Sequence, residues 1–239
     1  MTLWEHLAEL RSRLIKSVVA VAAGAVLAWM FYDRIFDFLL HPYRDINPDA
    51  KLYVTSPLQG FGTRLQVCTW GGITFAMPVI LWQIWRFVTP GLYPNEKRYA
   101  VPFTLSAIVL FLFGAAIAYL TLNPALEFLI DVGGSNFEQI FSPDSYVKLI
   151  AFMMLAFGAG FEFPVLLVAL QIAGVLAPSQ LGSWRRHAIV VIAAVAAVIT
   201  PSGDPVSMLA LAVPMYLFYE VSILIGWIFS RRKHRSRFG

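Results

Sequence analysis

Long apolar stretches constrain this chain more than any other feature. A helix needs about 20 mostly apolar residues to cross the hydrocarbon core of a bilayer. Four stretches reach or approach this length: 14–32, 65–85, 101–122 and 149–175. The composition agrees, because only 13% of the 239 residues are charged, against about 25% in an ordinary soluble domain. The sequence therefore predicts an all-α integral membrane protein.

Two further apolar stretches are less regular. The fifth, 188–199, would be about 18 Å long as a helix, well short of the ~30 Å hydrocarbon core. The sixth, 206–229, is long enough but contains Pro214 and Glu220, so the sequence leaves open whether it spans fully. We expect six transmembrane helices, with a fifth that is too short to span. The bilayer should thin around this helix, or protein should shield it.

The distribution of Lys and Arg predicts the orientation. With the N-terminus inside, thirteen of the eighteen Lys and Arg residues fall on the cytoplasmic side, as the positive-inside rule requires. Five of them lie in the tail, 230–239. A basic tail directly after an apolar helix is typical of binding to anionic lipid headgroups, so no nucleic-acid partner is expected. We expect one membrane domain, 1–239, with both termini in the cytoplasm.

The first residues, 1–13, have the pattern of an amphipathic stub. Thr2 and Glu5 have the spacing of a capping box, so a helix can begin at Thr2. The leucines that follow recur at helical spacing and predict a stub that lies along the cytoplasmic surface. Glu9 and Arg13 are four residues apart, and this spacing alone favours an ordinary surface ion pair.

Several function classes find no support in the sequence. Cys68 is the single cysteine, and the four His residues are widely separated, so neither a disulfide nor a metal site is expected. No GxxxxGK loop for nucleotide phosphates is present. We expect no cofactor and no enzymatic activity.

Four ordered motifs carry a family resemblance. Residues 6–14 read HLAELRSRL, residues 87–97 read FVTPGLYPNEK, residues 161–165 read FEFPV, and residues 200–204 read TPSGD, followed by VPMY at 213–216. In this order they resemble the motifs of the TatC family, the polytopic subunit of the twin-arginine protein translocase. The turn at 200–204 is one residue longer than the usual TPPD of the family.

The resemblance implies a receptor for signal peptides that carry two adjacent arginines. Glu9 and Glu96 would bind this pair, and Leu10, Arg11, Phe87 and Tyr93 would belong to the same site. A carboxylate suits this ligand, because a guanidinium matches it in bidentate geometry and an ammonium does not. The family further implies export of folded proteins across the bacterial cytoplasmic membrane with the proton motive force. Single-span TatA- and TatB-type subunits and other copies of the chain would be partners.

The resemblance also assigns residues within the membrane. Glu162, with Pro164 two residues later, would lie on a concave face inside the bilayer. Because a charged side chain at the bilayer centre is costly, Glu162 should face protein or a wet cavity. Thr200, Asp204, Met208 and Glu220 are expected to contact partners at or near the outer turn. For Glu220, a structural polar contact between helices, with Tyr216 as a donor, is an equal alternative.

Two other readings use the same residues differently. A proton-coupled carrier for small solutes would use Glu162 and Glu220 as relay carboxyls. However, the sequence shows no inverted repeat between its halves, a common feature of such carriers. A membrane scaffold without a ligand would leave the acids near the N-terminus unexplained. The translocase receptor is therefore the leading hypothesis.

Overall fold

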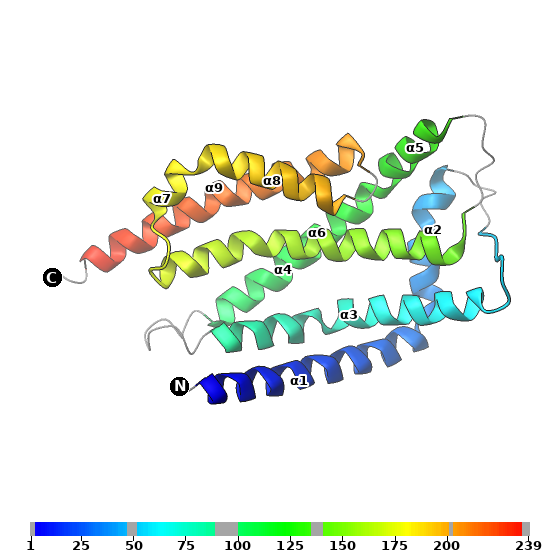
Figure 1. Ribbon diagram of the computed structural model, residues 1–239, viewed down its shortest axis with the longest axis horizontal. Helices are drawn as coiled ribbons and strands as arrows, with labels where there is room; N and C mark the ends of the chain where they lie inside the picture. Colours follow the sequence, from blue (N-terminus) through cyan, green and yellow to red (C-terminus); the bar gives the residue numbers. More distant parts are fainter. Residues whose placement is uncertain (1–2, 47–51, 89–99, 135–140, 201–202, 236–239) are drawn as a thin grey trace.

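The computed structural model describes residues 3–46, 52–88, 100–134, 141–200 and 203–235. Within these ranges the chain forms nine helices and no strand: α1 (Leu3–Met30), α2 (Tyr32–Ile46), α3 (Gln59–Val88), α4 (Ala100–Leu120), α5 (Leu122–Gly133), α6 (Pro143–Ile172), α7 (Pro178–Ser183), α8 (Arg185–Ile199) and α9 (Pro205–Arg235). The long helices run roughly lengthwise, and the start of α1 and the end of α9 lie at the same end of the molecule (Figure 1).

Five segments are long and apolar enough to cross a membrane: Trp4–Met30, Gln59–Phe87, Val101–Gly133, Pro143–Ile172 and Pro205–Phe229. Each overlaps an apolar stretch of the sequence, and the all-α membrane architecture is confirmed. The last segment, whose span the sequence left open, has 25 residues. It is therefore about 37 Å long and sufficient to span.

The remaining membrane helix is short, as predicted. α8 has 15 residues, which gives a length of about 22 Å against a hydrocarbon core of ~30 Å. It packs mainly against α9, with which it forms the upper part of the molecule in Figure 1. A helix of this length leaves the bilayer to thin beside it or relies on neighbouring helices for shielding.

The N-terminal residues belong to the same helix as the first span, because α1 continues from Leu3 to Met30. The position of residues 1–13 along the cytoplasmic surface stays a prediction. α1 contacts α3 along its length: Arg13 is hydrogen-bonded to Gln83, and Gly24 lies against Gly72.

The α1–α3 contact depends on the absence of side chains. A Cβ atom at Gly24 would lie 2.6 Å from the carbonyl oxygen of Gly72, and one at Gly72 would lie 2.7 Å from the backbone nitrogen of Ala25. The α4–α6 contact is similar, since a Cβ at Gly114 would lie 2.7 Å from the carbonyl oxygen of Phe157. Small residues allow this close approach, which drives the association of helices in membranes.

The segments opposite the N-terminus contain helices α2 and α5. Pro42 lies inside α2 and is buried. A proline in a helix leaves the carbonyl four residues earlier without its backbone donor. Here that carbonyl belongs to Phe38, and the Tyr119 hydroxyl donates to it at 2.8 Å. This substitute bond explains why α2 tolerates Pro42.

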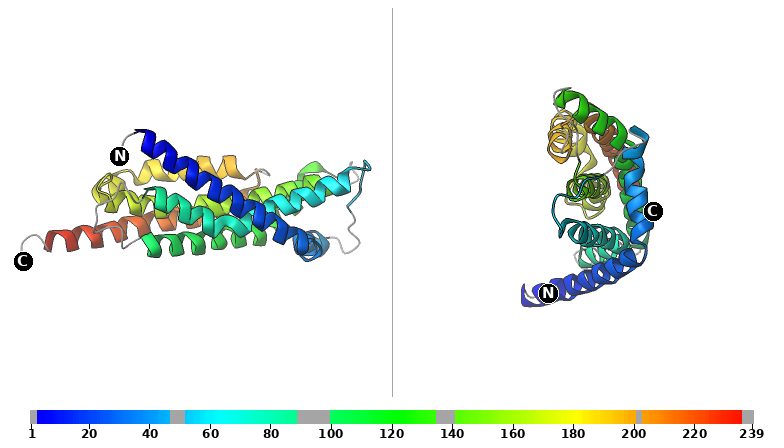
Figure 2. Two further views of the ribbon diagram at one scale, coloured as in Figure 1. Left: turned by 90° about the horizontal axis from the view of Figure 1, so that it is seen from below. Right: turned by 90° about the vertical axis from the view of Figure 1, so that its right-hand side faces the viewer.

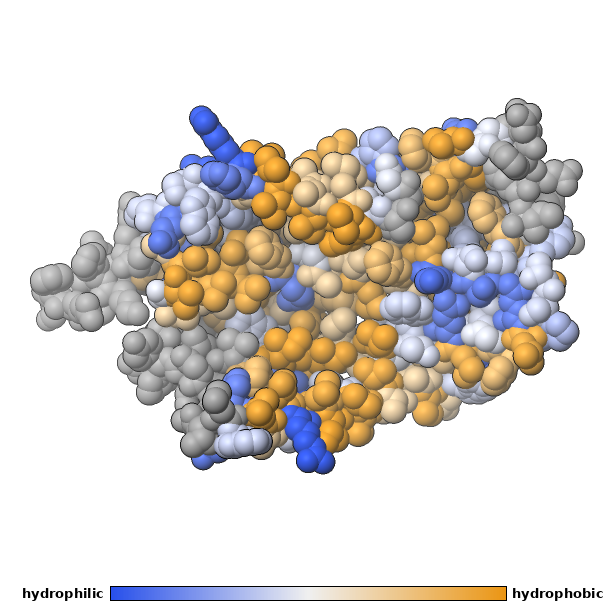
Figure 3. Space-filling view, in the orientation of Figure 1, coloured by the Kyte–Doolittle hydropathy of each residue, from blue (hydrophilic) through white to orange (hydrophobic). Residues whose placement is uncertain are grey.

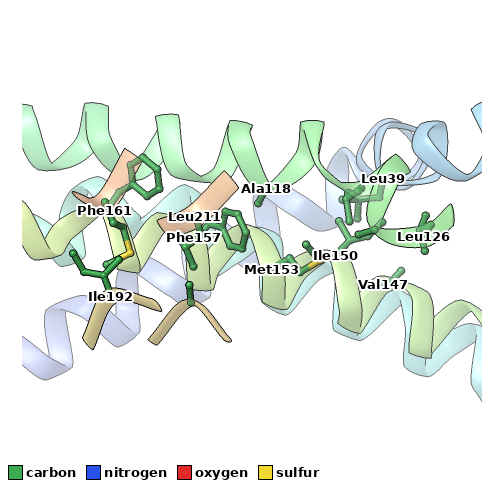
Figure 4. Close-up of a cluster of buried hydrophobic side chains, with 14 of the residues drawn as sticks. Leu39, Ala118, Leu126, Val147, Ile150, Met153, Phe157, Phe161, Ile192 and Leu211 are labelled. Atoms are coloured by element: carbon green, nitrogen blue, oxygen red, sulfur yellow. The ribbon is translucent and has the colours of Figure 1, made fainter. Parts of the chain in front are cut away.

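The main core forms around α6. Figure 4 shows Met153, Phe157 and Phe161 of α6 among Leu39, Ala118, Leu126, Ile192 and Leu211 of other helices. Phe157 and Phe161 are fully buried. α6 is therefore the central helix of the core. Its remaining exposed side chains lie on the face that no other helix covers.

Candidate functional site

A polar cluster joins the first turns of α1 to the last turns of α3. The Nε atom of Arg13 donates to Oε1 of Glu9 at 3.1 Å, and one terminal nitrogen donates to the same oxygen. The other terminal nitrogen donates to Oε1 of Gln83 at 3.3 Å. Only 18% of the Glu9 side chain and 14% of the Arg13 side chain are exposed. The pair is therefore anchored and shielded, unlike the surface pair that spacing alone favoured.

The second carboxylate oxygen of Glu9 has no such partner. Oε2 is buried, and no donor among the described residues forms a hydrogen bond with it. A buried acceptor without a donor costs about 1–3 kcal/mol, and more when it is charged. A ligand that brings N–H donors to this oxygen would remove that cost. Glu9 is thus an oriented acceptor with one unused oxygen.

An aromatic contact lies beside this cluster. The rings of His6 and Phe87 stack with their centroids 4.4 Å apart and an angle of 25° between their planes. Leu10 and Arg11, in contrast, are exposed on α1. The structure therefore brings Glu9 and Phe87 to the same end of the α1–α3 pair and leaves Leu10 and Arg11 open to the surroundings.

Two predicted members of the site, Tyr93 and Glu96, lie outside the described residues. The segment that carries them follows α3, which ends at Val88, and precedes α4, which begins at Ala100. Their participation in the site with Glu9 stays a prediction.

The molecule has a concave face within the membrane part. Seen end on, the helices form a curved wall in which α1 and α8 project to the same side (Figure 2, right). α6 lies within this wall and packs against α3, α4 and α9. Its exposed stripe includes Phe152, Ala159, Phe163 and Leu166. Figure 3 shows a largely apolar surface over this region, interrupted by isolated hydrophilic residues.

Glu162 lies at the edge of the exposed stripe of α6. It is half-buried, and it precedes Leu166 of the stripe by one helical turn. Its Oε1 atom is buried without a hydrogen-bond partner among the described residues. Acidic residues within membrane spans normally pair with other groups or face a wet cavity. Glu162 therefore has an unused acceptor beside an apolar face.

Pro164 is buried inside α6, which continues through it to Ile172. A proline has no N–H group, so the carbonyl of Gly160 loses its helical donor. The Glu162 carboxyl and the Gly160 carbonyl therefore place two polar groups within one turn of α6. Neighbouring Phe161 is buried instead, with its ring centroid 5.8 Å from that of Phe113 and 5.7 Å from that of Phe218.

The residues of the predicted outer turn have local structural roles. Asp204 is fully buried, and its Oδ1 atom accepts a hydrogen bond from the backbone nitrogen of Ser207 at 2.6 Å, as an N-cap of α9 does. The Thr200 hydroxyl donates to the carbonyl of Ala196 at 2.9 Å. Met208 packs against the main core. The side chains of Thr200 and Asp204 are buried in this chain. Their contact with a partner stays a prediction.

Glu220 forms an ion pair between two helices. It lies on α9 about 24 Å along the helix axis from Asp204. Both its oxygens accept from Arg185 of α8, at 2.8 and 2.9 Å, and the Tyr216 hydroxyl donates to Oε1 at 3.1 Å. This is the polar contact between helices that the sequence offered as an alternative, and contact of Glu220 with a partner stays a prediction. A relay carboxyl would have to break this ion pair.

Gln83 is the member of the cluster that the sequence did not indicate. It is a polar residue within the apolar stretch 65–85, and this interruption was the available signal. The described residues contain no group of three or more His, Cys, Asp or Glu that could hold a metal ion.

The comparisons with known proteins agree with the motifs. The family model of the Sec-independent protein translocase protein (TatC) matches residues 5–214. The chain is 40% identical over 247 residues to TatC of Frankia casuarinae, covering 98% of this chain and 68% of that protein. It is 38% identical over 236 residues to TatC of Aquifex aeolicus, covering 98% of both.

Solved structures give the same result. A crystal structure of the twin-arginine translocase receptor TatC matches with a TM-score of 0.76 and 38% identity, covering 93% of this chain and 98% of that chain. A second one, in the detergent DDM, matches with a TM-score of 0.78, covering 92% and 99%. The chain therefore belongs to the TatC family: it is a multi-pass membrane component of the Sec-independent protein translocase, with a role in protein transport rather than catalysis.

Proposed function

We propose that this chain is the receptor for twin-arginine signal peptides and the core subunit of its translocase. The observation that carries the proposal is the buried, unpartnered Oε2 atom of Glu9 beside an anchored Oε1. The likeness to crystal structures of a twin-arginine translocase receptor supports it. In this proposal the signal peptide's arginine pair binds Glu9 together with Glu96.

The chemistry of Glu9 fits an arginine ligand. Arg13 donates to one oxygen only, so a second guanidinium can donate to the other without displacing it. The partial burial of the cluster strengthens this bond, because hydrogen bonds to charged groups gain from a low local dielectric. A lysine has a compact ammonium and lacks the planar fork of donors, so the site should prefer arginine.

The orientation follows from the charge distribution. Thirteen of the eighteen Lys and Arg residues fall on the side that contains the N-terminus and the tail, so we place both termini in the cytoplasm. The membrane is then the bacterial cytoplasmic membrane, and the signal peptide meets Glu9 from the cytoplasm. Transport uses the proton motive force through the whole complex.

The concave face is the proposed contact for partners within the bilayer. Its apolar stripe on α6 suits the apolar part of a signal peptide or the helix of a single-span TatA- or TatB-type subunit. The buried Oε1 of Glu162 can accept a hydrogen bond from such a partner. Further copies of the chain would assemble with these subunits in the complex.

Peptide binding to the purified protein tests the receptor function. A signal peptide with an RR pair should bind more tightly than its KK counterpart, and Glu9→Gln should remove most of this difference. The control is Glu5→Gln, an exposed acid one turn earlier on α1, which should keep the preference. Equal binding of RR and KK peptides by the unmodified protein contradicts the proposal.

A further inference from the structure

Arg64 forms an unusual cluster at the end of α3 opposite the Arg13 cluster. Its guanidinium carbon lies 4.6 Å from the ring centroid of Trp29 and 4.7 Å from that of Tyr32. Two rings therefore hold one cation, which is attracted to their electron-rich faces. The aromatic residues belong to the end of α1 and the start of α2, so Arg64 connects three helices.

The depth of Arg64 follows from the geometry of α1 and α3. Arg13 and Gln83 contact each other near one end of this pair, and Trp29 and Arg64 contact each other near the other. These contacts are separated by about 24 Å along α1 and about 28 Å along α3. The hydrocarbon core is ~30 Å thick, and Trp and Tyr concentrate at its boundaries. Arg64 therefore lies at headgroup level in the leaflet opposite the N-terminus.

The charge of Arg64 is not neutralised by a carboxylate. None of the ion pairs among the described residues includes Arg64, and its Nε atom is buried without a hydrogen-bond partner. Of the first acids of α2, Asp33 forms no ion pair with Arg64, and Asp37 is paired with Arg44 at 3.4 Å. Arg34 adds a second cation, with its guanidinium carbon 5.9 Å from the ring centroid of Phe31.

We propose that Arg64, held by Trp29 and Tyr32, binds the phosphate of an anionic phospholipid in the leaflet opposite the N-terminus. The guanidinium carbon lies over both rings, and because the residue is only half-buried, part of the side chain stays accessible to a ligand. A phosphate matches the guanidinium donors in bidentate geometry. The acyl chains would then run toward the middle of the bilayer, along exposed residues of α3 that follow Arg64, which include Leu65 and Phe75.

Lipid titration tests this site. Phosphatidylglycerol is added to the delipidated, purified protein in a nonionic detergent, and native mass spectrometry counts the bound lipids. Arg64→Gln should lose one lipid, with an affinity about tenfold weaker or more. Arg64→Lys should also bind more weakly, because lysine lacks the planar fork. The matched control is Arg44→Gln, which removes an exposed cation on the same side and should bind like the unmodified protein.

Two further measurements separate a lipid site from a structural role. Phosphatidylglycerol should raise the Tm of the unmodified protein and of Arg44→Gln but not of Arg64→Gln, whatever the Tm of each variant without lipid. An analogue with a photoreactive headgroup should crosslink to the segments 29–34 and 58–65, and an excess of inorganic phosphate should not prevent it.

Three outcomes overturn the proposal. Equal lipid binding and equal Tm increase in Arg64→Gln would leave Arg64 as a contact between helices only. An equal loss in Arg44→Gln would indicate diffuse charge attraction. Displacement of the lipid by inorganic phosphate would indicate a site for a soluble anion.

Discussion

Arg13 donates two hydrogen bonds to a single oxygen of Glu9 and leaves the other oxygen buried without a partner. An arginine can pair with a carboxylate in a fork that uses both oxygens. Here the third nitrogen group of Arg13 is directed to Gln83 of α3 instead. The arrangement fixes Glu9 and at the same time preserves an acceptor for a second cation.

The first prediction concerns the two acids of the proposed site. Glu9→Ala and Glu96→Ala should each weaken binding of an RR peptide by about 1.5–3 kcal/mol, the range for hydrogen bonds to charged groups. If both acids bind one arginine pair, the double variant should lose less than the sum of the single losses. Calorimetric titration at low salt measures the cycle. Unchanged affinity in both single variants would refute the assignment.

The second prediction concerns the close contact of α1 and α3. Gly72→Ala should lower the thermal stability, because its Cβ would lie 2.7 Å from the backbone nitrogen of Ala25. Overpacking of this kind costs about 1–3 kcal/mol. Gly62→Ala is the matched control in the same helix, since a Cβ there meets nothing within 4 Å. A Gly72→Ala variant as stable as this control would show that the two helices can separate freely.

The sequence predicted the membrane helices because apolar length is a local property. The shortness of α8 followed from the same counting, and its 15 residues agree. The contact of α1 with α3 was not predictable in this way. It depends on Gln83, which is 70 residues from its partner Arg13, and on the contact between Gly24 and Gly72. Such pairings require knowledge of which helices are neighbours.

The site shows the same division. The motif indicated Glu9, but its buried Oε2 atom became visible only with α3 packed beside α1. For Glu220, the sequence suggested Tyr216 as a hydrogen-bond donor. It did not show that Arg185, 35 residues earlier, reaches the carboxylate from α8. For Glu162, the apolar stretch predicted the helix but not the face on which the residue lies, because that face depends on which sides of α6 other helices cover.

The third prediction distinguishes a contact between helices from a proton relay at Glu220. Glu220→Gln keeps a hydrogen-bond acceptor for Arg185 but removes the titratable proton. The ion pair is partly exposed, with 29% of the Glu220 side chain accessible, so its loss should change the stability little. Export of a folded reporter with a twin-arginine signal should therefore persist. Complete loss of export, with normal protein levels, would favour the relay.

The last prediction concerns Glu162 on the concave face. One of its oxygens is buried without a partner, and the exposed stripe beside it is apolar, so a partner helix that docks there can donate a hydrogen bond to it. Glu162→Gln keeps the shape and an acceptor oxygen, whereas Glu162→Ala removes both. If hydrogen bonding is what matters, Gln should preserve most of the export and Ala should lose much of it. Crosslinking between α6 and a single-span subunit should fall in parallel with export in the Ala variant.

Two results would change this interpretation of Glu162. If Gln fails as completely as Ala while the protein still inserts and binds RR peptides, the carboxyl acts through its charge or its proton. If both variants export normally, the acid is only tolerated at the edge of α6. Phe163→Ala serves as the control for the surface itself, because Phe163 is exposed on the same stripe and carries no polar atom. The Phe163→Ala variant should crosslink less, because it loses apolar contact with the partner helix. The difference in export between Glu162→Gln and Glu162→Ala should persist in its presence.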